Sequence, residues 1–203
     1  MHDIVMQRVA IFKGNPNIAG MRITSASQFV GEVLKDRLWH TTSYDRFCMI
    51  LRDGALKVEP PLPESARHKT ANGPINYSFV RSLGGVSLFN FADFHMDGYE
   101  SLFPLSNWRA FVPLWHAWER SIWIEIDACS CDSIIIQPNQ LLDRWRFEQA
   151  WGHTIMPQIE AAHIGDVPMQ AFRSSMLVTP IKAGEWEVDF HDFKVCQSAP
   201  APR

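Results

Sequence analysis

Short segments with strand-like spacing of hydrophobic residues outnumber those with helical spacing along this chain. Apolar and polar positions alternate over residues 86–91 and 121–127, which is typical of strands with one buried face. Weaker strand patterns occur at residues 38–42, 55–59, 133–137, 159–164, 176–179 and 186–195. The pattern therefore predicts a sheet as the main element of the fold.

Helices are predicted in three places between these strands. Residues 25–35 and 139–151 repeat apolar positions at helical spacing. Ser43 is a typical N-cap for a third helix that runs to Asp53. Gly54 follows at the position where many helices end with a residue in the left-handed conformation. Since strands outnumber helices and are joined mostly by loops, we expect an α+β fold with a mostly antiparallel sheet and helices packed on it.

The chain length and composition are those of one folded domain. The 203 residues are expected to form a single domain over 1–203, with the weakly patterned segment 1–24 as an N-terminal arm. Hydrophobic residues make up 46% and charged residues 20%, which excludes a disordered chain. The net charge of −3 argues against a strongly basic nucleic-acid-binding protein, although it allows a local groove lined by Arg.

Targeting and metal-binding signals are weak. No apolar run approaches the roughly 20 residues that span a bilayer, and the first residues lack the pattern of a secretory signal. The four cysteines show no disulfide-framework spacing. Cys129 and Cys131 have no second Cys or His pair at a matching spacing, so we expect no metal site. These features predict a cytoplasmic protein without a membrane partner.

Several common catalytic motifs are missing from the sequence. It has no Gly-x-Gly-x-x-Gly, no Walker-type phosphate loop, no Gly-x-Ser-x-Gly and no His-Glu-x-x-His. A doubly wound dinucleotide-binding fold, a nucleoside triphosphatase and a serine hydrolase are therefore disfavoured.

The first positive signal is a histidine at the end of a predicted strand. His40 is followed by Thr41, Thr42 and Ser43, which lead into the predicted helix. Hydroxyl groups and helix N-terminal amides beside an imidazole can bind a ribose or a phosphate. The ordinary alternative is an interior histidine followed by a helix cap, and the residues alone leave both interpretations open.

The second signal is the predicted strand after the glycine pair at 84–85. Paired glycines allow a ligand or another strand to approach the backbone. Alternation places Ser87, Phe89 and Phe91 on one face, which would join a hydroxyl to two aromatic rings. A half-buried structural strand is the alternative interpretation.

The third signal is a carboxylate among small and apolar residues. We expect Gln158 and Glu160 to alternate onto one side of a strand, so that an amide and a carboxylate project together. A carboxylate on an exposed strand is usually only a solvated charge, but the apolar surroundings of Glu160 are unusual for such a residue. Glu160 is thus the expected centre of any chemistry.

From residue 39 to residue 178 these three segments, in this order, resemble the ADP-ribosyltransferase fold, and within it the DarT-type toxins that modify DNA. The run from Glu160 to Pro168 is also similar to the one that follows the catalytic Glu of DarT relatives. The second strand lacks the Arg and the Pro-Met features of DarT enzymes, so DNA, RNA and protein all stay open as acceptors.

The resemblance implies a role for each signal. His40 would bind the adenosine-side ribose of NAD with Thr41 and Thr42 beside it, and Ser87 and Phe89 would line the nicotinamide pocket. Glu160 would act in catalysis, with Gln158 assisting it.

A cation is also expected beside the diphosphate of NAD. Because the Arg guanidinium makes planar, bidentate contacts with phosphate, Arg81 is the first candidate and Arg67 its rival. Acceptor contacts are expected from residues 60–76 and 103–118.

The implied protein is a mono-ADP-ribosyltransferase that consumes NAD, acting as a toxin or defence effector on a nucleic acid or protein. An antitoxin or immunity protein would then be a partner. Three alternatives are a non-catalytic module with this fold, an RNA 2′-phosphotransferase, and an enzyme that only hydrolyses NAD.

Overall fold

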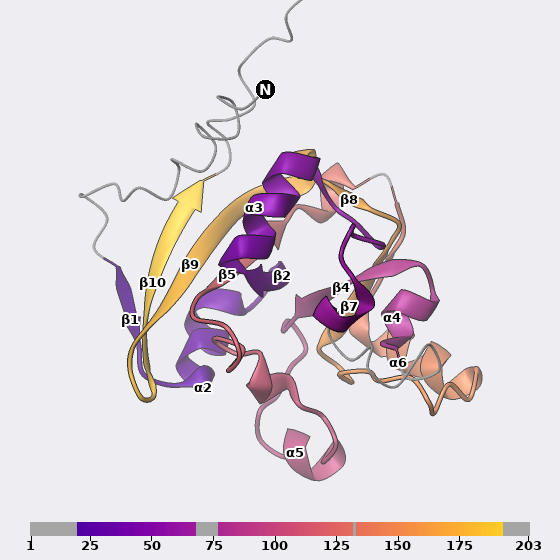
Figure 1. Cartoon of the computed structure of the whole chain (residues 1–203). Helices are drawn as coiled ribbons and strands as arrows, with labels where there is room; N and C mark the ends of the chain where they lie inside the picture. The colour runs from indigo at the N-terminus through magenta and orange to yellow at the C-terminus, as the bar shows by residue number, and fades with distance from the viewer. Residues whose placement is uncertain (1–19, 68–76, 132, 193–203) are drawn as a thin grey trace, which may run out of the picture.

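The computed structural model describes residues 20–67, 77–131 and 133–192, and the strands within them form two sheets (Figure 1). The strands are β1 (Met21–Ile23), β2 (Leu38–Ser43), β3 (Ala55–Leu56), β4 (Gly85–Asn90), β5 (Ser121–Ile126), β6 (Ile135–Ile136), β7 (Glu160–Ile164), β8 (Val167–Pro168), β9 (Phe172–Lys182) and β10 (Glu185–Asp192).

The larger sheet has eight strands in the order β1-β10-β9-β5-β2-β4-β7-β6. Every neighbouring pair in it is antiparallel. Strands β3 and β8 form a separate antiparallel pair. The prediction of an α+β fold with a mostly antiparallel sheet is therefore confirmed.

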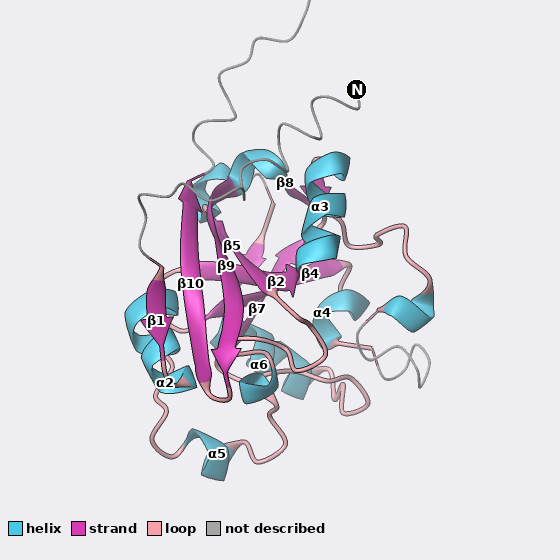
Figure 2. Cartoon of the chain, turned by 60° about the vertical axis from the view of Figure 1, so that its left-hand side comes forward, coloured by secondary structure: helices cyan, strands magenta, loops and turns pink. Residues whose placement is uncertain are grey.

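Helices are few and short. Figures 1 and 2 place α5 at the tip of a lobe that extends from the sheet, formed by residues 91–120 between β4 and β5. They are α2 (Ala26–Phe29), the π-helical turn η2 (Val30–Leu34), α3 (Tyr44–Asp53), α4 (Phe79–Ser82), α5 (Tyr99–Leu102) and α6 (Pro138–Phe147), with 3₁₀ turns η3 (Glu64–Ala66), η5 (Trp108–Ala110), η6 (Ala128–Ser130) and η7 (Met169–Ala171). No helix among the described residues is long and apolar enough to cross a membrane.

Helix α3 forms as its end signals predict. The Ser43 hydroxyl accepts a hydrogen bond from the backbone N–H of Arg46 at 3.3 Å, and Gly54 closes the helix with a φ of 76°. The helix predicted at 25–35 is confirmed in part, because α2 continues as a π-helical turn. The helix predicted at 139–151 already ends at Phe147.

Several strand boundaries differ from the prediction because pairing partners, rather than local pattern, set them. The strand predicted at 176–179 begins at Phe172, since β9 lies between β5 and β10 and pairs with both. The strand at 55–59 is only two residues long, which is the length of its partner β8. Residues 21–23 of the expected N-terminal arm form β1, and residues 1–19, 68–76 and 193–195 lie outside the described part of the chain.

Each face of the large sheet carries its own core. Successive residues of a strand point to opposite faces, so Trp123 of β5 joins one core while Ile122 and Ile124 join the other. Helix α2 contributes Phe29 to the first core, and α3 contributes Phe47 to the second. The sheet is thus fixed from both sides.

The large sheet separates between β2 and β4. These strands pair only through Leu38 with Asn90 and Trp39 with Phe89. Beyond that point β2 continues along β5 as far as Ser43, whereas β4 continues along β7. Because the remaining residues of β2 and β4 have no ladder between them, the sheet opens in the middle.

Replacing Trp123 by Ala tests the first core. The side chain is fully buried, and its ring contacts Phe89 at 5.3 Å and Phe29 at 5.6 Å between centroids. We expect the free energy of unfolding to fall by about 3–5 kcal/mol, measured by urea denaturation. Leu105→Ala, at a position that is 97% exposed, is the control and should change it by less than about 0.5 kcal/mol. Equal losses in both variants would contradict this account of the core.

Candidate functional site

Two pockets adjoin at the opening between β2 and β4. We call the one beside helix α3 the α3 pocket, with a volume of about 260 Å³, and the other the Glu160 pocket, with a volume of about 540 Å³. Residues that line both pockets mark the place where they join: His40, Thr42, Arg46, Arg67, Ser78 and Ser87. The three sequence signals are therefore brought together around one cavity system.

Glu160 is a buried carboxylate that lines the Glu160 pocket. Its side chain lies at the first position of β7, and the residue is only 3% exposed. The hydroxyl of Ser87 donates to Oε1 at 2.6 Å, and the backbone N–H of Met156 donates to Oε2 at 2.9 Å. Hydrogen bonds of this length to a carboxylate are charge-assisted and fix its orientation.

The turn before β7 holds the carboxylate in place. The backbone N–H groups of Ile159 and Glu160 both donate to the carbonyl of Met156, at 3.2 and 2.8 Å. Gln158 lies in this turn with a φ of 59°, and it is not among the residues that line either pocket. The expectation that Gln158 projects beside Glu160 from one strand is wrong, because the strand begins at Glu160.

Tyr99, which belongs to the lobe, forms a hydrogen bond to the turn before β7. Its hydroxyl donates to the carbonyl of Pro157 at 2.7 Å and lies 2.9 Å from the hydroxyl of Ser106. Burial, together with the nearby charge of Glu160, raises the pKa of Tyr99 to about 12. The phenol is therefore protonated at neutral pH and remains a donor to the turn.

The His40 side chain bridges the separated strands β2 and β4 with one hydrogen bond. Nδ1 lies 3.0 Å from the backbone carbonyl of Ser87, and because a carbonyl only accepts, Nδ1 carries the proton. Burial lowers the pKa of His40, and the charge of Arg46 lowers it further, while the bond to the Ser87 carbonyl acts in the opposite direction. A neutral ring with Nε2 as an acceptor is the form that this environment favours.

Thr41 and Thr42 continue β2 beyond His40. Both are buried, Thr41 lines the Glu160 pocket, and Thr42 lines both pockets. The Thr41 hydroxyl is buried without a hydrogen-bond partner in the part of the chain that the structure describes. Buried polar atoms normally have a partner, so this hydroxyl is a group that a bound molecule could satisfy.

Arg81 lines the α3 pocket but is already paired. Its guanidinium contacts the carboxylates of Glu59 at 3.0 Å and Glu64 at 2.9 Å, and it lies 3.9 Å from the ring centroid of Tyr77. The hydrogen bonds from Arg81 lower the pKa of Glu64 to about 2, and the same contact raises the pKa of Arg81. Arg67 pairs with Glu59 and donates to two backbone carbonyls.

Arg46 is a site residue that the sequence reasoning missed. It lines both pockets and donates to the carbonyl of Ala66. Among the described residues, no carboxylate lies within 4.0 Å of it, and burial lowers the pKa of its guanidinium. The available signal was its position in the first turn of the capped helix after His40.

Aromatic side chains form one wall of the Glu160 pocket. Phe89 lies 5.9 Å from Phe111, and Phe111 stacks on Trp115 at 4.7 Å with 29° between the rings. Asn107 and Trp118 complete this wall. Residues of the expected acceptor stretch 103–118 therefore do line the pocket, although Trp108 of that stretch lies in the core.

No group of three or more His, Cys, Asp or Glu side chains in the described ranges is placed to hold a metal ion. Cys129 and Cys131 form no disulfide and lie in the turn after β5, where Asp127 accepts hydrogen bonds from the Cys129 N–H and the Ser130 hydroxyl. This loop is separate from the two pockets.

The burial of His40 predicts a pH dependence of stability. A folded-state pKa below the ordinary 6.5 means that the unfolded chain binds more protons as the pH falls through that value. We expect the wild type to lose more unfolding free energy than His40→Gln between about pH 7.5 and 5.5, because Gln keeps a donor for the Ser87 carbonyl and does not titrate. His95→Gln, at an exposed position, should follow the wild type in urea denaturation. A parallel decline in all three proteins would contradict the prediction.

Comparison of the chain with models of protein families, with curated proteins and with solved structures gave no match. The indications of function are therefore the geometry of the two pockets and the three segments that line them. The geometry comprises a fixed carboxylate, a neutral imidazole, an aromatic wall, and a guanidinium that has no carboxylate partner among the described residues.

Proposed function

We propose that the protein is an NAD-dependent mono-ADP-ribosyltransferase with the ADP-ribosyltransferase fold. The observation that carries the proposal is the buried Glu160 carboxylate, which Ser87 and a backbone amide hold at a pocket in the opened sheet. The order of His40, Ser87 and Glu160 along three strands is the order that the resemblance implies. Their convergence on one cavity system supports the proposal.

NAD would lie across both pockets. The adenosine would occupy the α3 pocket, with its ribose at His40 and Thr42, and the nicotinamide ribose would lie at Glu160 near Ser87. The diphosphate would then cross the junction of the pockets, where Arg46 lies. We assign the diphosphate to Arg46 ahead of Arg81, because Glu59 and Glu64 already neutralise Arg81.

The reaction breaks the bond between nicotinamide and ribose, and the bonding electrons leave with nicotinamide as a neutral molecule. Positive charge grows on the ribose as this bond breaks, as in glycoside cleavage. A fixed carboxylate stabilises that charge more in the transition state than in the ground state. An acceptor nucleophile then bonds to the anomeric carbon and loses its proton. Glu160 provides the stabilising charge in this scheme.

The acceptor would reach the anomeric carbon through the Glu160 pocket. The wall of Phe111, Trp115 and Trp118 offers flat apolar surfaces beside the carboxylate. Aromatic faces bind nucleobases as well as apolar side chains, so the acceptor class is a nucleic acid or a protein. Action as a toxin or defence effector belongs to the same proposal and has only the resemblance as support.

The first test is Glu160→Gln, which removes the charge but keeps the shape. Incubation with labelled NAD and a mixture of cell protein, DNA and RNA should label an acceptor with the wild type. We expect labelling by the variant to fall by at least about 10²–10³, because one electrostatic group in the transition state is lost. Glu119→Gln, at an exposed position, is the matched control and should retain full activity.

The outcomes of that experiment separate the alternatives. Labelling that persists in Glu160→Gln would contradict the role of Glu160 in stabilising the transition-state charge. Free ADP-ribose without a labelled acceptor would identify an NAD hydrolase, and NAD binding without any turnover would identify a non-catalytic module. Turnover only with RNA that carries a 2′-phosphate would identify a 2′-phosphotransferase.

The second test concerns the cation at the diphosphate. Arg46→Gln should weaken NAD binding by about tenfold or more in calorimetry, since a charge-assisted hydrogen bond is worth about 1.5–3 kcal/mol. Arg81→Gln should weaken it less, and Arg146→Gln, on the exposed side of α6, should not change it. A larger loss with Arg81→Gln than with Arg46→Gln would return the diphosphate to Arg81.

A further inference from the structure

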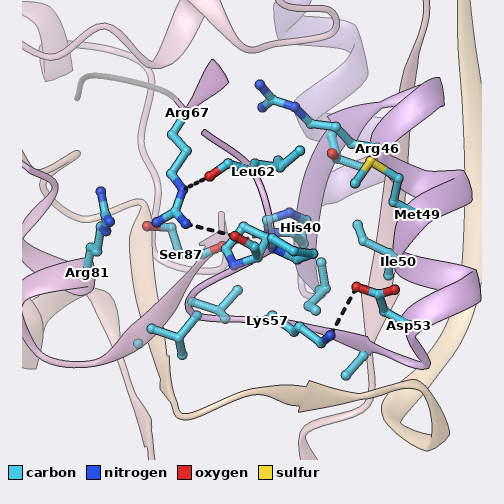
Figure 3. Close-up of a pocket in the computed structure, with 18 of the residues that line it drawn as sticks. His40, Arg46, Met49, Ile50, Asp53, Lys57, Leu62, Arg67, Arg81 and Ser87 are labelled. Atoms are coloured by element: carbon cyan, nitrogen blue, oxygen red, sulfur yellow. Dashed lines mark hydrogen bonds and ion pairs between the residues drawn. The ribbon is translucent and has the colours of Figure 1, made fainter. Parts of the chain in front are cut away.

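The α3 pocket has an apolar body with charged groups at separate ends. Its apolar lining comes from helix α3, strand β3, the segment after β3 and the start of β4, and it includes Ile50, Leu56, Val58, Leu62 and Val86. Arg46 and Arg67 lie toward the junction with the Glu160 pocket, since they line both. Asp53 and Lys57 line only the α3 pocket, and Figure 3 shows them apart from Arg67 and Arg81.

Asp53 and Lys57 form an ion pair at this end of the pocket. Lys57 Nζ lies 3.1 Å from Asp53 Oδ2, and the side chains are 36% and 18% exposed. Arg52 Nε lies 3.7 Å from Asp53 Oδ1. Ion pairs between partly exposed side chains contribute little to stability. The pair therefore matters more for what it presents to the pocket, a hydrogen-bond acceptor directly beside a donor.

The two ends match the polarity of a nucleotide. A nucleotide has phosphate at one end, a flat apolar base at the other and a ribose between them. The pocket has Arg46, which has no carboxylate within 4.0 Å among the described residues, at one end, His40 in its lining, and the Asp53–Lys57 pair away from that end. A base that extends from a ribose at His40 along the apolar lining would bring its far edge toward this pair.

We propose that Asp53 and Lys57 read the base in the α3 pocket and select a 6-aminopurine over a 6-oxopurine. This proposal rests on the proposed function, because it requires the α3 pocket to hold the adenosine end of NAD. The 6-amino group of adenine donates to Asp53, and the ring nitrogen beside it accepts from Lys57. A 6-oxo group places an acceptor where the carboxylate needs a donor, so that hydrogen bond is not formed and the two oxygens repel each other.

Calorimetry on the full chain with AMP, IMP and GMP tests the selection. AMP should bind at least about tenfold more tightly than IMP or GMP, a difference of about 1.4 kcal/mol. In Asp53→Asn the amide can donate to a 6-oxo group, so the AMP preference should fall to within about threefold. Asp45→Asn makes the same change at an exposed position on the same helix and should keep the wild-type preference.

Lys57→Gln provides a second variant should Asp53→Asn fail to fold, and it too should reduce the preference. Equal binding of the three nucleotides, a preference for GMP, or an unchanged ratio in both variants would overturn the selection by this pair. Absence of any mononucleotide binding would overturn it as well. The proposed function is judged separately, by Glu160-dependent cleavage of NAD in the wild type, so either idea can fail alone.

Discussion

The short ladder between β2 and β4 is the constraint on which the candidate site depends. Backbone groups inside a protein need hydrogen-bond partners, and strands normally provide them for one another. Here the ladder stops after two residue pairs, and the His40 side chain supplies the partner for the Ser87 carbonyl instead. A side chain holds the strands near each other without closing them, and this leaves space for two pockets.

Ser87 connects the two halves of the opened sheet. Its backbone carbonyl accepts from His40, which belongs to the half built on β2 and β5, while its hydroxyl donates to Glu160 on β7. The lobe adds a further support, because Tyr99 binds the turn that leads to Glu160. The position of one carboxylate is thus set by strands, a turn and a lobe that are far apart in sequence.

Charge pairing then divides the arginines around the cavity into two kinds. Glu59 and Glu64 bind Arg81 and Arg67 and so fasten the segment that covers the α3 pocket. Arg46 has a backbone carbonyl as a partner but no carboxylate within the described residues. Arg81 and Arg67 therefore mainly hold the wall of the α3 pocket, whereas the positive charge of Arg46 is available for an anionic ligand.

The sequence by itself determined the features that depend on neighbours along the chain. The cap at Ser43, the left-handed end at Gly54 and the opposite faces of β4 follow from local spacing. Only the tertiary structure decided where β2 leaves β4, that Gln158 belongs to a turn, and that Arg46 faces the cavity. These depend on which strand pairs with which and on where carboxylates from distant segments lie, and no local pattern records either.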